Sequence, residues 1–326
     1  MHILVTNDDG PPSAESSPYV LPFVQTLKAA GHTVSVIVPD EQRSWIGKAH
    51  IVGQDVQATA YWPPATNPDV HQSDLVAKGP EGHESNEHPW ILVNSTPATC
   101  AQLGLGSHFF EERGPIDLVI SGPNYGRNTT AVFALSSGTL GAALEAAACG
   151  HRSIALSFAF FDRINDPTIV SNCCKHALKV CEYLAANSDF DQGRLYSVNV
   201  PVQAGVDQRR VVWTKMLQNS WKKGACFQEQ SSAGAMDPES EEVRIRRRES
   251  AVGAESEPAS GTQTPAKEEW KTRHFKWSPR FTDVYESVEK AGPGSDGWTV
   301  KAGETSITAL RANFMHIEGM DGEVKL

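Results

Sequence analysis

The feature that most constrains the fold of this chain is an alternation of short apolar strands and helical segments. Strands are predicted over His2 to Thr6 and Thr33 to Val38, because both segments are rich in β-branched or Leu side chains. Between them, apolar side chains recur at the spacing of one helix face, at Tyr19, Phe23, Leu27 and Ala30. Pro22 fits such a helix only in its first turn, and Gly31 ends it. A strand–helix–strand unit of this length implies parallel strands and a right-handed crossover.

The same alternation continues along the chain. Strands are predicted over residues 90–94, 117–121, 153–158, 195–200 and 210–215. Helices are predicted over residues 97–105, 138–148 and 169–186. The strand at 117–121 carries a continuous apolar run, which is typical of a strand buried on both faces of a sheet. The sequence therefore predicts an α/β fold with a doubly wound, mostly parallel sheet.

Two stretches interrupt this pattern. Residues 60–88 are rich in Pro, Asn, Gly and His, which indicates a loop or a small hairpin. Residues 228–269 are dominated by Ser, Glu, Ala, Gly and Pro and cannot bury enough apolar surface to offset chain entropy. We expect a disordered, low-complexity insert there, with the Arg run at 246–248 as solvated charge. We predict a single domain over residues 1–326, with residues 270–326 as its closing segment.

The charge balance limits the partners of the chain. Lys and Arg number 29 against 39 Asp and Glu, which gives a formal net charge of -10 at pH 7. Duplex nucleic acid and anionic membranes need a basic face, so neither is expected, while a local pocket for a small phosphate is compatible. No apolar run reaches the length of a membrane span, and Ile3 to Val5 is too short for a signal peptide. Six cysteines without CxxC spacing favour a reducing, cytoplasmic location.

The sharpest candidates for chemistry are Asp8 and Asp9, directly after the first predicted strand. Open α/β sheets bind their ligands at the carboxyl ends of the strands. Two adjacent carboxylates repel each other and are costly to bury unless a cation neutralises them. An Asp-Asp-Gly turn ending at Gly10, with a side chain that caps a helix, explains the same residues without a ligand. These residues alone support the two interpretations equally.

Later strand ends carry compact polar groups of the same kind. Asn124 and Asn128 follow a buried strand, and their amides can offer oxygens to a metal and N–H groups to an anion. Ser137, Gly138 and Thr139 open a helix, where hydroxyls and backbone N–H groups form an anion site. Turn formation and ordinary helix capping explain each segment equally well when it is taken alone.

The combination is more specific than any member. Ser44 follows the second predicted strand, and residues 94–97 follow the third, so four successive strand ends carry polar groups. The sequence has no GxGxxG after a strand, no GxxxxGK[ST], no GxSxG and no DxDxT. Dinucleotide-binding proteins, P-loop NTPases, α/β-hydrolases and aspartyl-phosphate phosphatases are therefore disfavoured.

Taken in order, these motifs resemble the SurE family of metal-dependent 5'/3'-nucleotidases and acid phosphatases. The matching segments are ILVTNDDG, VPDEQRS, NSTPATC, DLVISGPNYGRN, SSGTLGAALEA, YSVNVP and DGWTVKAGETSITAL. The segments that look more like the fungal branch than the bacterial one are DDGPPS, SSPYV and RSWIGKAH. Trp45 stands where the family usually has Gly, and Thr99 stands where it usually has Asp.

The resemblance implies a Rossmann-like, three-layer α/β/α core with a C-terminal arm that joins subunits into a homodimer or homotetramer. It implies one divalent cation held by Asp8, Asp9, Ser44 and Asn124. It implies that the substrate phosphate lies against Asn124, Asn128, Ser137, Gly138 and Thr139, with catalytic roles for Asp8, Asp9 and Asn128. Carboxylate, hydroxyl and amide oxygens are hard ligands, which suit Mg²⁺ or Mn²⁺. Either aspartate can serve as general base.

The expected activity is hydrolysis of nucleoside monophosphates or related small phosphomonoesters by a metal-activated water. The alternative is a non-catalytic α/β module that binds nucleotide or phosphate without turnover, because Trp45 or an altered rim obstructs the site. A third hypothesis is a scaffold that acts through the insert at 228–269.

Overall fold

The structure is a computed structural model, and it describes residues 1–68, 88–160, 166–221, 226–230, 273–314 and 318. Its centre is a nine-stranded sheet in the order β3-β4-β2-β1-β5-β6-β7-β11-β8. The strands are β1 (His2–Thr6), β2 (Thr33–Pro39), β3 (Ala58–Tyr61), β4 (Trp90–Val93), β5 (Leu118–Tyr125), β6 (Ser153–Ala159), β7 (Arg194–Pro201), β8 (Val211–Trp213) and β11 (Thr305–Arg311). The α/β fold class with a mostly parallel sheet is confirmed.

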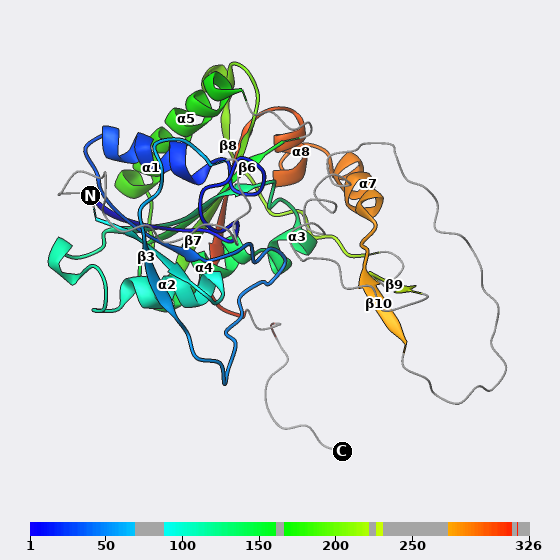
Figure 1. Ribbon diagram of the computed structural model, residues 1–326. Helices are drawn as coiled ribbons and strands as arrows, with labels where there is room; N and C mark the ends of the chain where they lie inside the picture. The colour runs from blue at the N-terminus through cyan, green and yellow to red at the C-terminus, as the bar shows by residue number, and fades with distance from the viewer. Residues whose placement is uncertain (69–87, 161–165, 222–225, 231–272, 315–317, 319–326) are drawn as a thin grey trace.

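Helices cover both faces of this sheet, which gives the three expected layers (Figure 1). Helices α1 (Val20–Ala29) and α5 (Pro167–Asn187) pack side by side on one face. Helices α2 (Pro97–Leu105) and α4 (Gly138–Ala148) pack together on the other. The short 3-10 helices are η2 (Glu111–Arg113) and η3 (Val206–Gln208).

The order of the strands places a switch point beside β1. The chain passes from β1 outward to β2 and β4, and then returns to β5 on the other side of β1. The pairs β1–β2, β1–β5, β2–β4, β5–β6 and β6–β7 are parallel, whereas β3 and β11 run antiparallel to β4 and β7. Open α/β sheets bind ligands at such a reversal, at the carboxyl ends of the strands.

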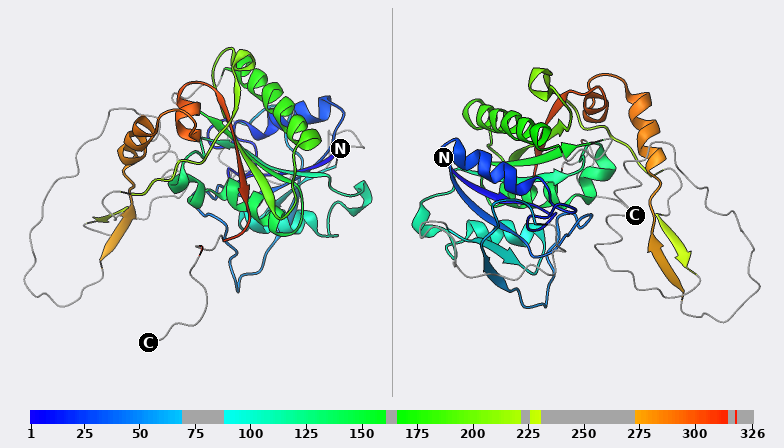
Figure 2. Two further views of the ribbon diagram at one scale, coloured as in Figure 1. Left: turned by 180° about the vertical axis from the view of Figure 1, so that it is seen from behind. Right: turned by 45° about the horizontal axis from the view of Figure 1, so that its top comes forward.

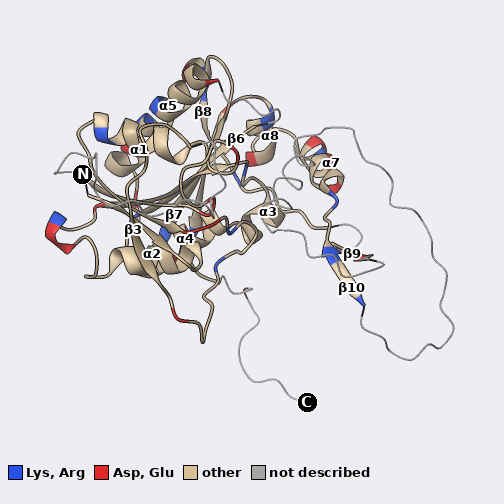
Figure 3. Ribbon diagram, in the orientation of Figure 1, with Lys and Arg blue, Asp and Glu red and all other residues tan. Residues whose placement is uncertain are grey.

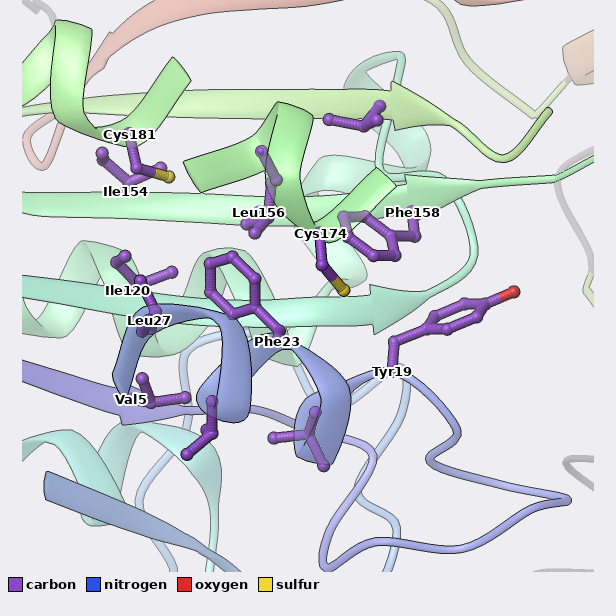
Figure 4. Packing of buried hydrophobic residues seen from close by; sticks show 14 of the residues in the cluster. Val5, Tyr19, Phe23, Leu27, Ile120, Ile154, Leu156, Phe158, Cys174 and Cys181 are labelled. Atoms are coloured by element: carbon purple, nitrogen blue, oxygen red, sulfur yellow. The ribbon is translucent and has the colours of Figure 1, made fainter. Parts of the chain in front are cut away.

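The continuous apolar sequence of β1 explains how one strand packs against the helices on both faces of the sheet. Ile3 and Val5 belong to the core cluster under α1 and α5, while Leu4 packs into the cluster under α2 and α4. Successive strand residues point to opposite faces, so a strand buried on both must be apolar throughout. Figure 4 shows Phe23 and Leu27 of α1 packed in this core with strand residues such as Val5 and Ile154, and with Cys174 and Cys181.

Two helix predictions are confirmed with small differences at the ends. Helix α1 begins at Val20, so Pro22 lies in its first turn, where its missing N–H costs no helical hydrogen bond. The helix ends at Ala29, and Ala30, which was predicted to continue the apolar stripe, is exposed and was therefore wrongly placed on it. Helix α5 begins at Pro167 because Asp166 caps it, accepting hydrogen bonds from the N–H groups of Thr168 and Ile169.

Strand β5 and the segment after it differ from the prediction. The strand does not end at Ser121 but continues to Tyr125, because after a register shift Asn124 and Tyr125 pair again with β6. A short helix, α3 (Ala131–Ser136), follows and was not predicted, since six residues are too few for a helical periodicity. Gly122 has φ +127° and lies so close to β6 that a Cβ would sit 2.1 Å from the Leu156 carbonyl oxygen. Only glycine fits there.

Other differences concern the two stretches that interrupt the alternation of strands and helices. Residues 60–88 were expected to form a loop or a small hairpin; residues 58–61 form edge strand β3, which pairs antiparallel with β4, and residues 69–87 lie outside the described residues. Residues 228–230, expected to begin the insert, belong to strand β9 (Phe227–Gln230), which pairs antiparallel with β10 (His274–Trp277). The remainder of the insert, with its Arg run at 246–248, lies outside the described residues.

The C-terminal segment returns to the core after this ribbon. Helix α7 (Phe281–Ala291) and helix α8 (Asp296–Lys301) lead into β11 in the central sheet. The β9–β10 ribbon stands apart from that sheet in every view, and α7 follows β10 in the chain (Figure 2).

Charged residues lie mainly on the helices and loops around the central sheet (Figure 3). None of the described helices combines the length and the apolar character needed to cross a bilayer.

Candidate functional site

A small cavity lies at the switch point, between the carboxyl ends of β1 and β5. Its volume of about 30 Å³ holds one small ion or one to two waters. The residues that line it are Asp8, Ser44, Trp45, Asn124, Tyr125, Gly126, Arg127, Asn128, Phe133 and Ser137. Five of these are predicted site residues, brought together from four separate parts of the chain: Asp8, Ser44, Asn124, Asn128 and Ser137.

A tight turn presents the two aspartates after β1. The Asn7 amide nitrogen donates to the Gly10 carbonyl at 2.8 Å, and the Gly10 N–H donates to the Asn7 side-chain oxygen at 3.0 Å. Gly10 has φ +81°, which suits glycine at this closure. Asp8 and Asp9 are 3% and 1% exposed, so the turn holds two carboxylates inside the protein.

Asp8 is fixed against the N-terminus of α4. The Thr139 hydroxyl donates to Asp8 Oδ1 at 2.6 Å, and a Cβ on Gly138 would lie 2.7 Å from Asp8 Cβ. The Asp8 backbone carbonyl accepts from the Arg43 N–H at 2.7 Å, which ties the β1 end to the loop after β2. Gly138 therefore permits the close approach, and Thr139 contacts the carboxylate instead of lining the cavity.

Asp9 faces the end of β5. Its Oδ2 accepts from the Tyr125 N–H at 2.6 Å, a charge-assisted hydrogen bond, and the Gln42 amide lies 3.5 Å from its Oδ1. Asp9 is adjacent to the cavity but is not among the residues that line it.

Ser44 lies on a loop that is anchored to both α3 and α4. The Gly47 N–H donates to the Ser136 carbonyl at 2.9 Å. Further along the loop, Lys48 Nζ lies 2.5 Å from Glu145 Oε2, and Gln102 donates to Oε1 of the same carboxylate at 2.5 Å. Burial alone would raise the pKa of Glu145, but the hydrogen bonds from Lys48 and Gln102 and the positive charge of Lys48 lower it.

The two asparagines are held by their own amides. The Asn124 amide nitrogen donates to the Gly126 carbonyl at 2.8 Å, so the side-chain oxygen is its remaining polar atom. The Asn128 amide nitrogen donates to the Ser157 hydroxyl at 3.0 Å, and the Asn128 backbone N–H donates to the Asn199 side-chain oxygen at 2.9 Å. Asn199 belongs to the YSVNVP motif, and its supporting role was not foreseen.

The N-terminus of α4 completes this side of the cavity. Ser137 caps the helix, because its hydroxyl accepts from the Leu140 N–H at 3.1 Å. The first N–H groups of a helix carry partial positive charge and favour anions. The helix start predicted at Gly138 is confirmed.

Asp296, in the C-terminal part of the chain, holds the loop that contains Asn128. Its carboxylate accepts from the N–H groups of Thr130 at 2.9 Å and Leu217 at 3.0 Å. Burial raises the pKa of Asp296, and these backbone hydrogen bonds oppose the shift only in part. Thr130 has φ +71°, an uncommon backbone conformation for a β-branched residue, and the bond to Asp296 helps to hold it.

Aromatic rings form another part of the cavity wall, and their contacts with the C-terminal segment were not predicted. Trp45 packs on Phe133 with ring centroids 5.5 Å apart and on Trp277 at 4.5 Å, and Phe133 contacts Phe281 at 5.9 Å. The Arg127 guanidinium lies 5.7 Å from the Phe133 ring centroid and is 8% exposed. No motif joins these positions, because Trp277 and Phe281 come from a distant segment.

The donor set fits a hard divalent cation. Asp8, Ser44 and Asn124 place carboxylate, hydroxyl and amide oxygens on a cavity of ionic size. Within the described ranges, His, Cys, Asp and Glu form no cluster of three or more that could hold a metal. A thiolate or imidazole metal site is therefore not supported in that part of the chain.

Comparisons with known proteins identify the family of the chain. The sequence matches the family described as Survival protein SurE over residues 3–223. It is 31% identical over 218 residues to the 5'-nucleotidase SurE of Thermosynechococcus vestitus, covering 66% of this chain and 69% of that protein. It is 32% identical over 221 residues to the 5'-nucleotidase SurE of Nitratidesulfovibrio vulgaris, covering 65% and 74%.

A longer relative aligns with the whole chain. The Saccharomyces cerevisiae protein named Probable tubulin--tyrosine ligase PBY1 is 30% identical over 358 residues, covering 100% of this chain. This chain spans only 43% of that protein's length. The crystal structure of the SurE protein from Aquifex aeolicus aligns with a TM-score of 0.60 at 20% identity, covering 98% of this chain and 97% of that one. The shared fold and the extent of the family match lead to one conclusion: this chain belongs to the SurE family.

Proposed function

We propose that the chain is a divalent-metal-dependent phosphomonoesterase that hydrolyses nucleoside monophosphates or related phosphomonoesters. One observation carries the proposal: Asp8, Ser44 and Asn124 meet Asn128 and Ser137 around a single cavity of ionic size. Family membership supports a phosphatase-type hydrolase, since relatives in the family are named 5'-nucleotidases.

Asp8, Asp9, Ser44 and Asn124 would hold one Mg²⁺ or Mn²⁺. Asp9 does not line the cavity, and its proposed ligation rests on the family resemblance. A bound divalent cation supplies Lewis acidity at a phosphoryl oxygen and a water of lowered pKa. The Tyr125 N–H and the Thr139 hydroxyl keep the two carboxylates apart by holding each through its own hydrogen bond.

The remaining groups of the chain bind the phosphate. Asn128, the Ser137 cap and the N-terminus of α4 offer hydrogen-bond donors and partial positive charge at the cavity, and Arg127 adds a full positive charge. These groups are rigidly held before substrate arrives, so they stabilise the charge on the equatorial oxygens without reorganising.

The test is a steady-state assay of the full chain with AMP and p-nitrophenyl phosphate, with Mg²⁺, with Mn²⁺ and after exhaustive chelation. We expect metal-dependent phosphate release that Asp9→Ala abolishes, whereas Asp55→Asn, at an exposed carboxylate, retains it. Full activity after chelation contradicts the proposal.

A non-catalytic phosphate-binding module is the second candidate, because Trp45 borders a cavity of only about 30 Å³. A titration with AMP beside the same assay separates the two. Binding without turnover in the presence of metal favours the module.

The proposal extends to assembly and location. We expect one SurE-like domain that forms a homodimer or homotetramer through its C-terminal arm, residues 270–326, in the cytoplasm. The β9–β10 ribbon supports an arm, because it stands apart from the sheet and exposes 58% of Phe227 and 55% of Phe275 (Figure 2). Sedimentation of the full chain measures the assembly.

A further inference from the structure

A second cavity shares the lining residue Arg127 with the first. Its volume is about 280 Å³, close to the lower end of the range for small-ligand pockets. The residues that line it come from the loop after β5 and from α7 and α8: Arg127, Thr129, Val284, Tyr285, Val288, Glu289, Gly297 and Lys301. Helices α7 and α8 are neighbours in both Figures 1 and 2.

Arg127 connects this cavity with the phosphate site. Among the described residues it is the one side chain that lines both cavities. Its guanidinium lies 4.9 Å from the ring centroid of Tyr285 on the second cavity and 5.7 Å from that of Phe133 on the first. A molecule with an anionic end in the first cavity and an aromatic end in the second can therefore contact the Arg127 guanidinium with both ends.

The walls of the second cavity are apolar and well fixed. Val284 and Val288 are 2% and 9% exposed, and a Cβ on Gly297 would lie 2.7 Å from a methyl carbon of Val288. Asn219 donates to the Ser287 hydroxyl at 3.1 Å, which ties α7 to the segment before it. Because these walls are already packed, little further conformational entropy is lost when a ligand binds.

We propose that this cavity binds the leaving group of the substrate and favours the aromatic base of a nucleoside monophosphate over an aliphatic alcohol. The proposal rests on the phosphomonoesterase function and names its substrate class. Planar rings stack on an Arg guanidinium and on tyrosine faces, and an apolar surround strengthens both contacts. Thr129 and the Glu289–Lys301 ion pair provide polar groups for the edge of a base.

The first experiment compares kcat/KM for AMP and for ribose 5-phosphate in three proteins. Tyr285→Ala removes the ring, and we expect kcat/KM for AMP to fall about tenfold, mainly through KM, with a much smaller fall for ribose 5-phosphate. Tyr285→Phe keeps the ring and the preference. Tyr183→Ala, which removes an exposed tyrosine on α5, is the matched control. An equal fall for both substrates, or no fall for either, overturns the proposal.

A cavity-filling variant covers the case in which Tyr285→Ala does not fold. Val288→Phe places a ring in the cavity from α7, and it should reduce the preference for AMP in the same direction. Lys290→Phe adds the same ring to an exposed position of that helix and should leave the preference intact.

Binding of adenosine tests the subsite without any chemistry. We expect ligand-observed NMR to detect adenosine on wild type and on Asp8→Asn, and to lose it on Tyr285→Ala. No adenosine binding to wild type overturns the subsite, even if AMP is hydrolysed. If the protein releases no phosphate but binds adenosine in a way that depends on Tyr285, the proposed function is contradicted and the base-binding site is supported.

Discussion

The polar and the aromatic parts of the cavity wall are held together by different forces. One side comes from β1, the loop after β2, β5 and α4, and it is polar, buried and held by hydrogen bonds such as Thr139 to Asp8. The other side joins Trp45 and Phe133 to Trp277 and Phe281 of the C-terminal segment through ring packing. The polar side falls within residues 3–223, where the family match lies, and the C-terminal rings lie beyond it.

This difference separates two tasks. The polar side holds its carboxylates through hydrogen bonds such as those from Thr139 to Asp8 and from Tyr125 to Asp9, and the proposed reaction at a phosphoryl group requires such fixed geometry. The aromatic side offers area and polarisable surface, which selects among substrates and tolerates substitution better. Changes on the polar side should therefore reduce turnover of every substrate, and changes on the aromatic side should alter preference.

The largest expected effect is on the polar side, in Asp8→Asn. This variant keeps the shape of the side chain and its contact with Thr139 but removes one of two neighbouring negative charges. We expect kcat to fall about 1000-fold for all substrates. Because repulsion from Asp9 is relieved, the metal-free variant should gain about 0.5–2 kcal/mol in free energy of unfolding, measured by urea denaturation. A variant that loses both activity and stability contradicts this account of the pair.

A smaller effect is expected from Glu145→Gln, which weakens the anchor of the Ser44 loop. The variant loses a charge-assisted contact with Lys48, so we expect a loss of about 1–3 kcal/mol in stability and about a tenfold fall in kcat/KM. Glu112→Gln, at an exposed carboxylate, is the control.

The pH dependence of stability checks the same anchor. The folded-state pKa of Glu145 lies below its ordinary value of 4.5, so its contribution is present above that value and is lost as pH falls through the folded pKa. Wild type should therefore lose more free energy of unfolding than Glu145→Gln as the pH falls below 4.5. If the free energies of unfolding of the two proteins change equally with pH, the Glu145 carboxylate is not held in its charged form.

The smallest effect is expected on the aromatic side, at Trp45. Its φ of +60° is unfavourable for every residue with a Cβ, so Trp45→Gly should be more stable than Trp45→Ala by about 1 kcal/mol. Thermal unfolding of both variants measures the difference. Turnover of small phosphomonoesters should fall less than tenfold in Trp45→Gly, since the Trp45 ring supplies no oxygen ligand. Loss of turnover as large as in Asp8→Asn would erase the distinction between the two sides.

The polar side was largely predictable because its signals are local. An Asn-Asp-Asp-Gly turn at a strand end and a Ser cap before a small-residue helix each specify their own geometry, and the α/β alternation brings the strand ends to one edge. The sequence predicted that β5 ends at Ser121, because Gly-Pro-Asn is typical of a turn. In the structure the strand extends to Tyr125, because its last residues pair with β6.

The aromatic side could not be predicted in the same way. Trp45 and Phe133 contact rings from residues 277–285, and no periodicity or spacing relates positions so far apart in sequence. Arg127 lies inside a matched motif, yet its contact with Tyr285 depends on how α7 packs. Long-range packing of this kind is visible only in the folded chain.

The measurement that tests the central claim most directly is a calorimetric titration of the full chain with Mn²⁺. The account predicts one site per chain, lost in Asp8→Asn and in Asn124→Ala, and retained in Tyr285→Ala. Equal Mn²⁺ binding by wild type and Asp8→Asn would show that these oxygens do not hold a cation, and the phosphomonoesterase proposal would then fall with them.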